Sequence, residues 1–132
     1  MMNILLVDDI EGWLLFNKRN LETFFKEKEV SFYLCKSAAE AYDFALGFDD
    51  KIDIVITDLE MENMDIPAGE WLINNLRTIK STQSARYIII SASPTISFVA
   101  KRADADGFLR KASYHSNPIE LKYKLEELLG EL

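Results

Sequence analysis

Residues 52–61 read Ile-Asp-Ile-Val-Ile-Thr-Asp-Leu-Glu-Met, a short apolar run that ends abruptly in an acid, Asp58. The four residues before Asp58 are all β-branched, which is typical of a strand covered on both faces, because neither side-chain direction then meets water. A carboxylate directly after such a strand lies at the carboxyl edge of the sheet, where open α/β folds keep their sites. Asp58 is therefore the first candidate site residue.

Length and composition predict one domain over residues 1–132. The chain has 132 residues and is 48% hydrophobic, enough to fill a single core. No apolar stretch approaches the roughly 20 residues that span a bilayer, and residues 1–7 lack the basic start of a signal peptide. We therefore expect a cytoplasmic protein with no membrane contact. The single Cys35 fits a reducing compartment and is expected to be a buried structural thiol.

The charge balance argues against a direct nucleic-acid partner. The formal net charge is -7, whereas binding to a phosphate backbone depends on clustered Lys and Arg side chains. If the protein controls a gene, we expect another protein to make the contact with DNA. Part of the acidity is instead available to hold a metal ion.

Apolar runs alternate with helical patterns along the whole chain. Strands are expected at residues 3–7, 30–35, 54–57, 87–91 and 107–111. Helices are expected at residues 11–29, 37–47, 69–79 and 96–103, and in a last segment that begins at Pro118. This alternation predicts an α/β fold with a doubly wound five-stranded parallel sheet, order 2-1-3-4-5, flanked by five helices.

That strand order brings three acids together. Asp8 and Asp9 follow the first strand and Asp58 follows the third, and these two strands are neighbours at the switch point of the sheet. Three carboxylates in one crevice repel one another unless a cation lies among them. Carboxylate oxygens favour magnesium, with manganese as a second possibility. The fourth strand ends in Ser91 and the fifth in Lys111, so a hydroxyl and an ammonium group complete the parts that stabilise a transferring phosphoryl group, with Asp58 as nucleophile.

In these residues the chain resembles the receiver domains of two-component response regulators. The matching segments are Leu-Leu-Val-Asp8-Asp9, Ile-Val-Ile-Thr-Asp58-Leu-Glu-Met61, Met64-Asp65 with Gly69, Ile-Ile-Ile-Ser91-Ala92 and Ala105-Asp106-Gly107-Phe108-Leu-Arg-Lys111. They span nearly the whole chain in the order that the family shows. The resemblance implies that Asp58 accepts a phosphoryl group from a histidine kinase or a histidine phosphotransfer protein.

The resemblance also assigns the other site residues. Asp9, Asp58 and the backbone carbonyl of Glu60 would hold magnesium, and Asp8 would act largely through a metal-bound water. Ser91 and Lys111 would bind phosphoryl oxygens. Phe108 matches the aromatic switch residue of the family, although a Phe in a short strand is equally well explained as core.

Three features depart from the family pattern. Ile66, Pro67 and Ala68 form an insertion in the loop beside the site, and the segment between Ser91 and Lys111 is slightly short, which predicts a truncated or displaced fourth helix. Ala112 replaces the proline that usually follows the lysine. A cis bond without proline costs about 2.5 to 4 kcal/mol, so we expect the Lys111–Ala112 bond to be trans or strained.

Three functions remain open at this stage. The first is a stand-alone receiver, a monomer or weak dimer that is a switch rather than an enzyme and signals by binding an effector protein. The second is a pseudo-receiver that serves as a constitutive docking module, which the altered loop and Ala112 favour. The third is an aspartate-nucleophile phosphatase, because Glu60 stands two residues after Asp58, where such enzymes place an acid.

Trp13 and Trp71 lie on apolar helix faces and are expected to be core residues, and His115 is expected to be exposed.

Overall fold

The computed structural model describes residues 1–130 of the chain. The strands are β1 (Met2–Val7), β2 (Val30–Cys35), β3 (Ile54–Thr57), β4 (Arg86–Ser91) and β5 (Gly107–Arg110). The helices are α1 (Glu11–Phe24), α2 (Ala38–Gly47), α3 (Ala68–Leu76), α4 (Ile96–Arg102), α5 (Lys111–Ser116) and α6 (Ile119–Leu129). None of the helices within residues 1–130 is long and apolar enough to cross a bilayer.

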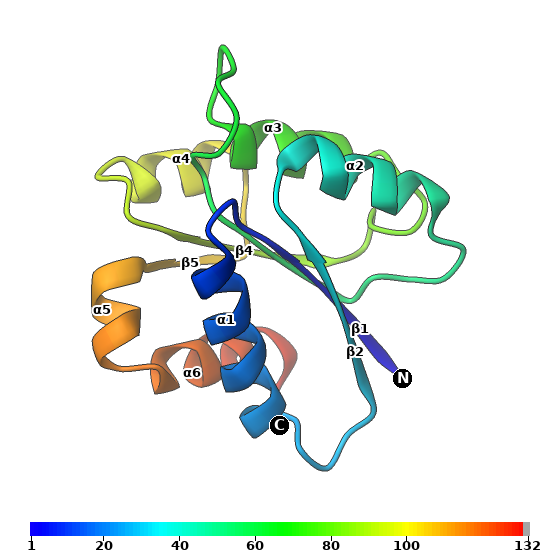
Figure 1. The fold of residues 1–132 in the computed structure, drawn as a ribbon, viewed down its shortest axis with the longest axis vertical. Coiled ribbons are helices and arrows are strands. Elements are labelled where there is room, and N and C mark those ends of the chain that lie inside the picture. Colours follow the sequence, from blue (N-terminus) through cyan, green and yellow to red (C-terminus); the bar gives the residue numbers. More distant parts are fainter. Residues whose placement is uncertain (131–132) are drawn as a thin grey trace.

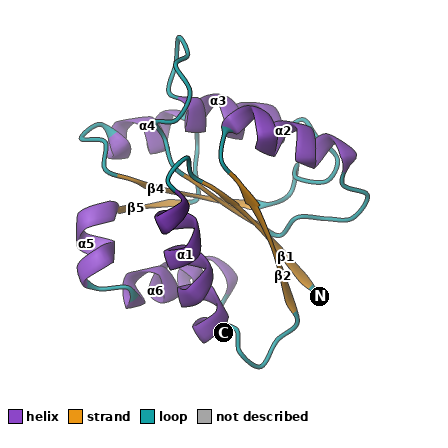
Figure 2. Cartoon of the chain, viewed as in Figure 1, coloured by secondary structure: helices purple, strands orange, loops and turns teal. Residues whose placement is uncertain are grey.

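All five strands are parallel and lie in the order β2-β1-β3-β4-β5, as the sequence predicts. In this register Val7 at the end of β1 pairs with both Cys35 and Thr57, and Thr57 pairs with Ile89. The helices α2, α3 and α4 cover one face of the sheet, and α1, α5 and α6 cover the other (Figures 1 and 2). The residues after β1 and β3 therefore meet at one edge.

Each face of the sheet has its own apolar core, because successive side chains of a strand point to opposite sides. Leu5, Val55 and Ile89 belong to the cluster under α2, α3 and α4. Ile4 and Ile56 belong to the cluster under the other three helices. These side chains are at most 1% exposed, and burial of each contributes roughly 1.5–3 kcal/mol. The central strands are thus fixed from both sides, which fixes the residues that follow them.

The expectation of five helices is wrong, because the described chain has six. The additional helix, α5, begins at Lys111, so β5 ends at Arg110 instead of at the lysine. Its buried anchor is Tyr114, whose hydroxyl donates to Asn17 Oδ1 at 2.8 Å and accepts from Asn20 Nδ2 at 2.9 Å. A helix of six residues shows too little of the 3.6-residue period to be recognised from its pattern.

The other differences lie at helix ends. The first helix ends at Phe24 instead of residue 29, since residues 26–29 are charged and exposed and have nothing to bury. Pro118 precedes the last helix as its N-cap, and α4 is short, with seven residues. Ser37 is the N-cap of α2, because its Oγ accepts the Glu40 N–H at 3.0 Å, while the Glu40 carboxylate accepts the Lys36 N–H at 3.2 Å. No peptide bond among residues 1–130 is cis, so Lys111–Ala112 is trans.

Cys35 is 3% exposed at the end of β2, as expected of a structural thiol. Burial, with a smaller contribution from the charge of Glu40, raises the pKa of this thiol to about 12. Since the folded-state pKa is raised, the stabilisation from the neutral thiol is complete below the unfolded pKa and is lost as the pH rises toward 12.

We predict that Cys35 in the folded protein reacts with a thiol reagent at pH 8 at least ~100-fold more slowly than in guanidinium chloride, because only a thiolate that is accessible reacts. The measurement is the rate of release of the chromophore from a disulfide reagent, with the unfolded chain as the control. Reaction of the native chain at the rate of the unfolded one would contradict the burial of this thiol.

Candidate functional site

Three acids meet at the carboxyl edge of the sheet. One carboxylate oxygen from each of Asp8, Asp9 and Asp58 lies within 4.8 Å of the other two. Asp8 and Asp58 are buried, whereas Asp9 faces solvent. The sequence-based prediction of a cluster after β1 and β3 is therefore confirmed in its geometry.

Lys111 supplies the positive charge within this cluster. Its Nζ lies 3.0 Å from Asp8 Oδ2 and 3.0 Å from Asp58 Oδ2, and the residue is 6% exposed. Burial acts to lower the pKa of Lys111, but its hydrogen bonds and charge interactions with Asp8 and Asp58 outweigh this and raise the pKa above the usual value. The lysine is consequently an ammonium group at neutral pH.

The two buried acids are also held by backbone amides. Asp8 Oδ1 accepts the Ile10 N–H at 2.9 Å, and Asp58 Oδ1 accepts the Leu59 N–H at 2.7 Å. Burial nevertheless raises the pKa of Asp8, only partly offset by the Ile10 N–H and by Lys111, while the charge of Asp58 raises it further. Burial thus disfavours the ionised form of Asp8 more than its hydrogen bonds favour it.

The donor set fits a divalent cation. When ionised, the three carboxylates and the single ammonium group leave two net negative charges in the cluster. All available ligand atoms are oxygens, which magnesium and manganese prefer. The carbonyl oxygen of Glu60 accepts no hydrogen bond from any residue between 1 and 130, so it is free to act as a further ligand.

Gly69 sets the position of the loop that carries Asp58. The Gly69 N–H donates to the Leu59 carbonyl at 2.8 Å. A Cβ on residue 69 would lie 2.1 Å from the Asp58 carbonyl oxygen and 2.9 Å from the Leu59 Cα, distances that no side chain tolerates. Glycine is therefore needed here for the close approach of two backbone segments. It is not needed for an unusual conformation, because its φ lies outside the positive region. The sequence motif includes Gly69, but its physical reason comes only from the packed structure.

Ser91 is the last residue of β4, and Phe108 lies near the start of the neighbouring strand β5. Ser91 is 2% exposed, and its Oγ accepts the Ser93 N–H at 3.1 Å, which leaves its own proton available for donation. Phe108 pairs with Ile89 in the sheet register and is half-buried, with the Arg110 guanidinium 5.9 Å from its ring centroid. Ser91 thus lies at the same edge of the sheet as the acids. Phe108 lies two residues before that edge on β5, which β4 separates from β3.

The loop after Asp58 has an anchor that the sequence analysis missed. The carboxylate of Glu62 accepts the N–H groups of Ala38 and Ala39, each at 2.8 Å, and so caps the first turn of α2. The loop between β3 and α3 contains Ile66 and Pro67 of the insertion and projects from the body of the molecule (Figure 1), whereas Ala68 is the first residue of α3. The Glu60 side chain is exposed within it. Glu62 lies 24 residues after Ala38, so no local sequence pattern marks it as the cap of α2.

Trp13 has contacts beside the site that the sequence does not predict. The sequence predicts a core residue, but Trp13 is only half-buried, and the Lys111 ammonium lies 5.0 Å from its ring centroid. The ring stacks on Tyr114 at 6.0 Å and meets the edge of His115 at 5.9 Å. His115 is exposed, as expected, but its ring lies beside the rings of Trp13 and Phe16. Trp13 therefore lies directly beside the charged cluster.

The fold matches solved receiver domains over nearly the whole chain. A CheY-like response regulator receiver domain protein from Methanospirillum hungatei JF-1 is 25% identical, with a TM-score of 0.73, and the match covers 99% of this chain and 95% of that one. CheY4 from Vibrio cholerae is 23% identical, with a TM-score of 0.74 and coverage of 98% and 99%. A response regulator from Burkholderia pseudomallei with a phosphorylated aspartic acid is 22% identical, with a TM-score of 0.66 and coverage of 100% and 76%. No family model and no curated protein matches the sequence.

We predict that Gly69→Ala lowers the free energy of unfolding by about 1–3 kcal/mol, or displaces the Asp58 loop, because the new methyl group overlaps backbone atoms. Urea unfolding monitored by circular dichroism measures the first effect, and manganese binding measures the second. Gly47→Ala is the matched control, since a Cβ there meets no atom within 4 Å. Equal stability and equal manganese affinity of both variants would show that this close approach does not constrain the loop.

Proposed function

We propose that this chain is a receiver domain in the cytoplasm that accepts a phosphoryl group on Asp58 in a magnesium-dependent reaction. The donor is the phosphohistidine of a histidine kinase or of a histidine phosphotransfer protein, and the phosphorylated chain signals by binding an effector protein. The observation that carries this proposal is the buried Lys111, held 3.0 Å from both Asp8 and Asp58 beside a third acid. In this proposal the chain acts as a phosphoacceptor switch and not as an enzyme with turnover.

The transfer is an in-line displacement at phosphorus. A carboxylate oxygen of Asp58 forms the new P–O bond, the P–N bond to the donor imidazole breaks, and the imidazole nitrogen takes the electron pair. Lys111 is already beside the acceptor oxygen and neutralises charge on the transferred group. Magnesium, held by Asp9, Asp58 and the Glu60 carbonyl with Asp8 acting through water, would neutralise the remaining charge.

Ser91 and Phe108 are the residues we assign to the response. The Ser91 hydroxyl proton is available, so the hydroxyl can donate to a phosphoryl oxygen. Phe108 is partly buried beside Ile89 of β4, where a shift of Ser91 changes the space available to its ring.

The pseudo-receiver is the second candidate. The insertion at residues 66–68 and the Ala112 departure favour it, since both lie beside the site. The complete set of Asp8, Asp58 and Lys111 in bonding contact disfavours it. The phosphatase alternative depends on Glu60, whose side chain faces solvent. Turnover of a small phosphate ester is the assay that separates it from a switch.

We predict that magnesium with beryllofluoride, a mimic of the phosphoryl group, changes the fluorescence of Trp13. Lys111 lies 5.0 Å from the Trp13 ring and would be drawn toward the added anion. The change should persist in Trp71→Phe and disappear in Trp13→Phe, which serve as a matched pair. Asp58→Asn should abolish the change in every background, because the acceptor oxygen is lost.

Phosphorylation itself is measured by intact mass after incubation with acetyl phosphate and magnesium. We expect one added phosphoryl group in the wild type and none in Asp58→Asn. If the wild type neither binds magnesium nor gains mass, the receiver proposal fails. Equal partner capture by wild type and Asp58→Asn, with and without the phosphoryl donor, would instead support the constitutive docking module.

A further inference from the structure

The sheet ends at β2, and the outer edge of this strand is open. The Met2 N–H donates to Glu29 O and the Asp8 N–H donates to Cys35 O, so odd-numbered residues of this segment face β1. In a parallel ladder the alternate residues Val30, Phe32 and Leu34 then direct their peptide groups away from the sheet. All three are partly exposed. The strand contains no charge and no proline, the usual devices that block pairing at an edge.

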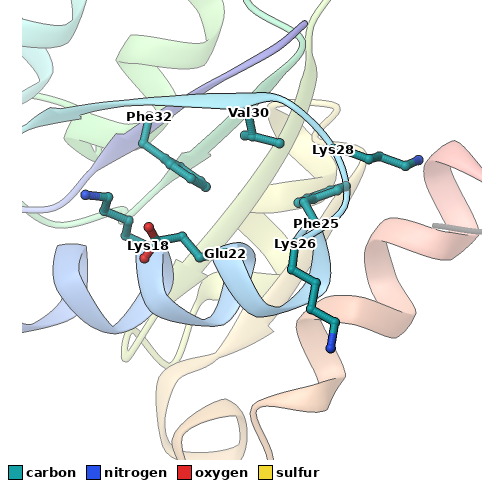
Figure 3. A pocket seen from close by; sticks show the side chains of 7 residues that line it. All are labelled: Lys18, Glu22, Phe25, Lys26, Lys28, Val30 and Phe32. Atoms are coloured by element: carbon teal, nitrogen blue, oxygen red, sulfur yellow. The ribbon is translucent and has the colours of Figure 1, made fainter.

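A groove runs along this edge on the α1 side (Figure 3). Its volume is about 540 Å³, and the apolar residues Phe25, Val30 and Phe32 contribute to its lining. The charged residues of the groove are Lys18, Lys26, Lys28 and Glu22. An apolar lining with a lysine-rich rim, next to unpaired strand peptides, is a surface that can hold an extended chain.

The charge of this groove is opposite to that of the whole chain. The chain carries a net charge of -7, yet the groove has three lysines and one glutamate. A neighbouring hollow that shares Lys26 and Lys28 adds Lys122 from α6 and one acid, Glu27. Within residues 1–130, none of Lys18, Lys26 and Lys28 forms an ion pair. These three ammonium groups are therefore available to carboxylates from outside the chain.

The other side of the β2 edge is aromatic as well. Tyr33, Phe44 and Phe48 form a half-buried cluster on the α2 side, with ring centroids 4.9–5.1 Å apart. A strand added to β2 would direct alternate side chains to the two faces of the sheet. One set would contact Phe32 and Phe25, and the other would contact the cluster around Tyr33. Both sets would thus meet aromatic side chains, of which Phe25 is buried and the others are half-buried.

From these observations we infer that the edge of β2 binds an extended acidic segment of a partner protein as an added strand. Backbone hydrogen bonds to Val30, Phe32 and Leu34 would provide the pairing. The lysines at positions 18, 26 and 28 select acidic side chains, and the aromatic residues on both faces take apolar ones. This inference does not rest on the proposed phosphoryl transfer, because none of these residues belongs to the acid cluster.

The test uses a fluorescein-labelled eight-residue peptide in which Glu alternates with Ile or Val, titrated with the full chain and followed by fluorescence polarisation. The triple variant Lys18→Glu, Lys26→Glu, Lys28→Glu should bind it about tenfold more weakly, since three rim charges each contribute several tenths of a kcal/mol. The triple variant Lys51→Glu, Lys80→Glu, Lys101→Glu is the matched control. It makes the same change in net charge at exposed lysines away from the groove and should bind as the wild type does.

A second peptide tests the pairing itself. The same sequence with an N-methyl group on every backbone amide retains its charge but cannot donate a hydrogen bond from either edge, and we expect it to lose binding. Binding of both peptides alike, equal weakening by both triple variants, or no binding at all would overturn the inference. So would sedimentation velocity that shows a dimer disrupted by Phe32→Lys, because a second copy would then be the occupant of the edge.

Discussion

The ammonium group of Lys111 lies between two buried carboxylates, 3.0 Å from Asp8 and 3.0 Å from Asp58. Removal of such a partner from a buried charge typically costs 3–5 kcal/mol, so the three side chains hold one another in place. Asp8 follows β1, Asp58 follows β3 and Lys111 follows β5. Their meeting therefore depends on the parallel register of the whole sheet, and the two apolar cores that fix the central strands also fix the charges at their ends.

A second constraint acts on the backbone around Asp58. Gly69 allows α3 to begin against the Asp58 and Leu59 backbone, and the next residue, Glu70, binds the Arg102 guanidinium of α4 with two hydrogen bonds of 2.6 and 2.7 Å. Glu62 joins the same loop to the start of α2. The loop after Asp58 is thus connected to the helices on one face of the sheet. A displacement of Asp58 would therefore also displace the starts of α2 and α3.

The sequence predicted the sheet order and the acid cluster because both depend on short-range signals. Continuous apolar runs mark buried strands, and an acid directly after such a run must lie at the sheet edge. It did not predict α5, whose buried anchor Tyr114 depends on Asn17 and Asn20 of α1. It also missed the contact of Trp13 with Lys111 and the cap provided by Glu62. These features join residues distant in the sequence, so no local period or motif encodes them.

The two charged regions of the molecule are separate in the fold. The acid cluster follows the carboxyl ends of β1 and β3, whereas the lysines of the β2 groove lie on α1 and in the turn before β2, toward the amino ends of the strands. An acidic segment would be repelled from the cluster, whose own charges leave an excess of negative charge, and attracted to the groove. A chain with a net charge of -7 can therefore still present a surface for an acidic partner. Because the groove shares no residue with the acid cluster, a segment bound in the groove would not displace any residue of the cluster.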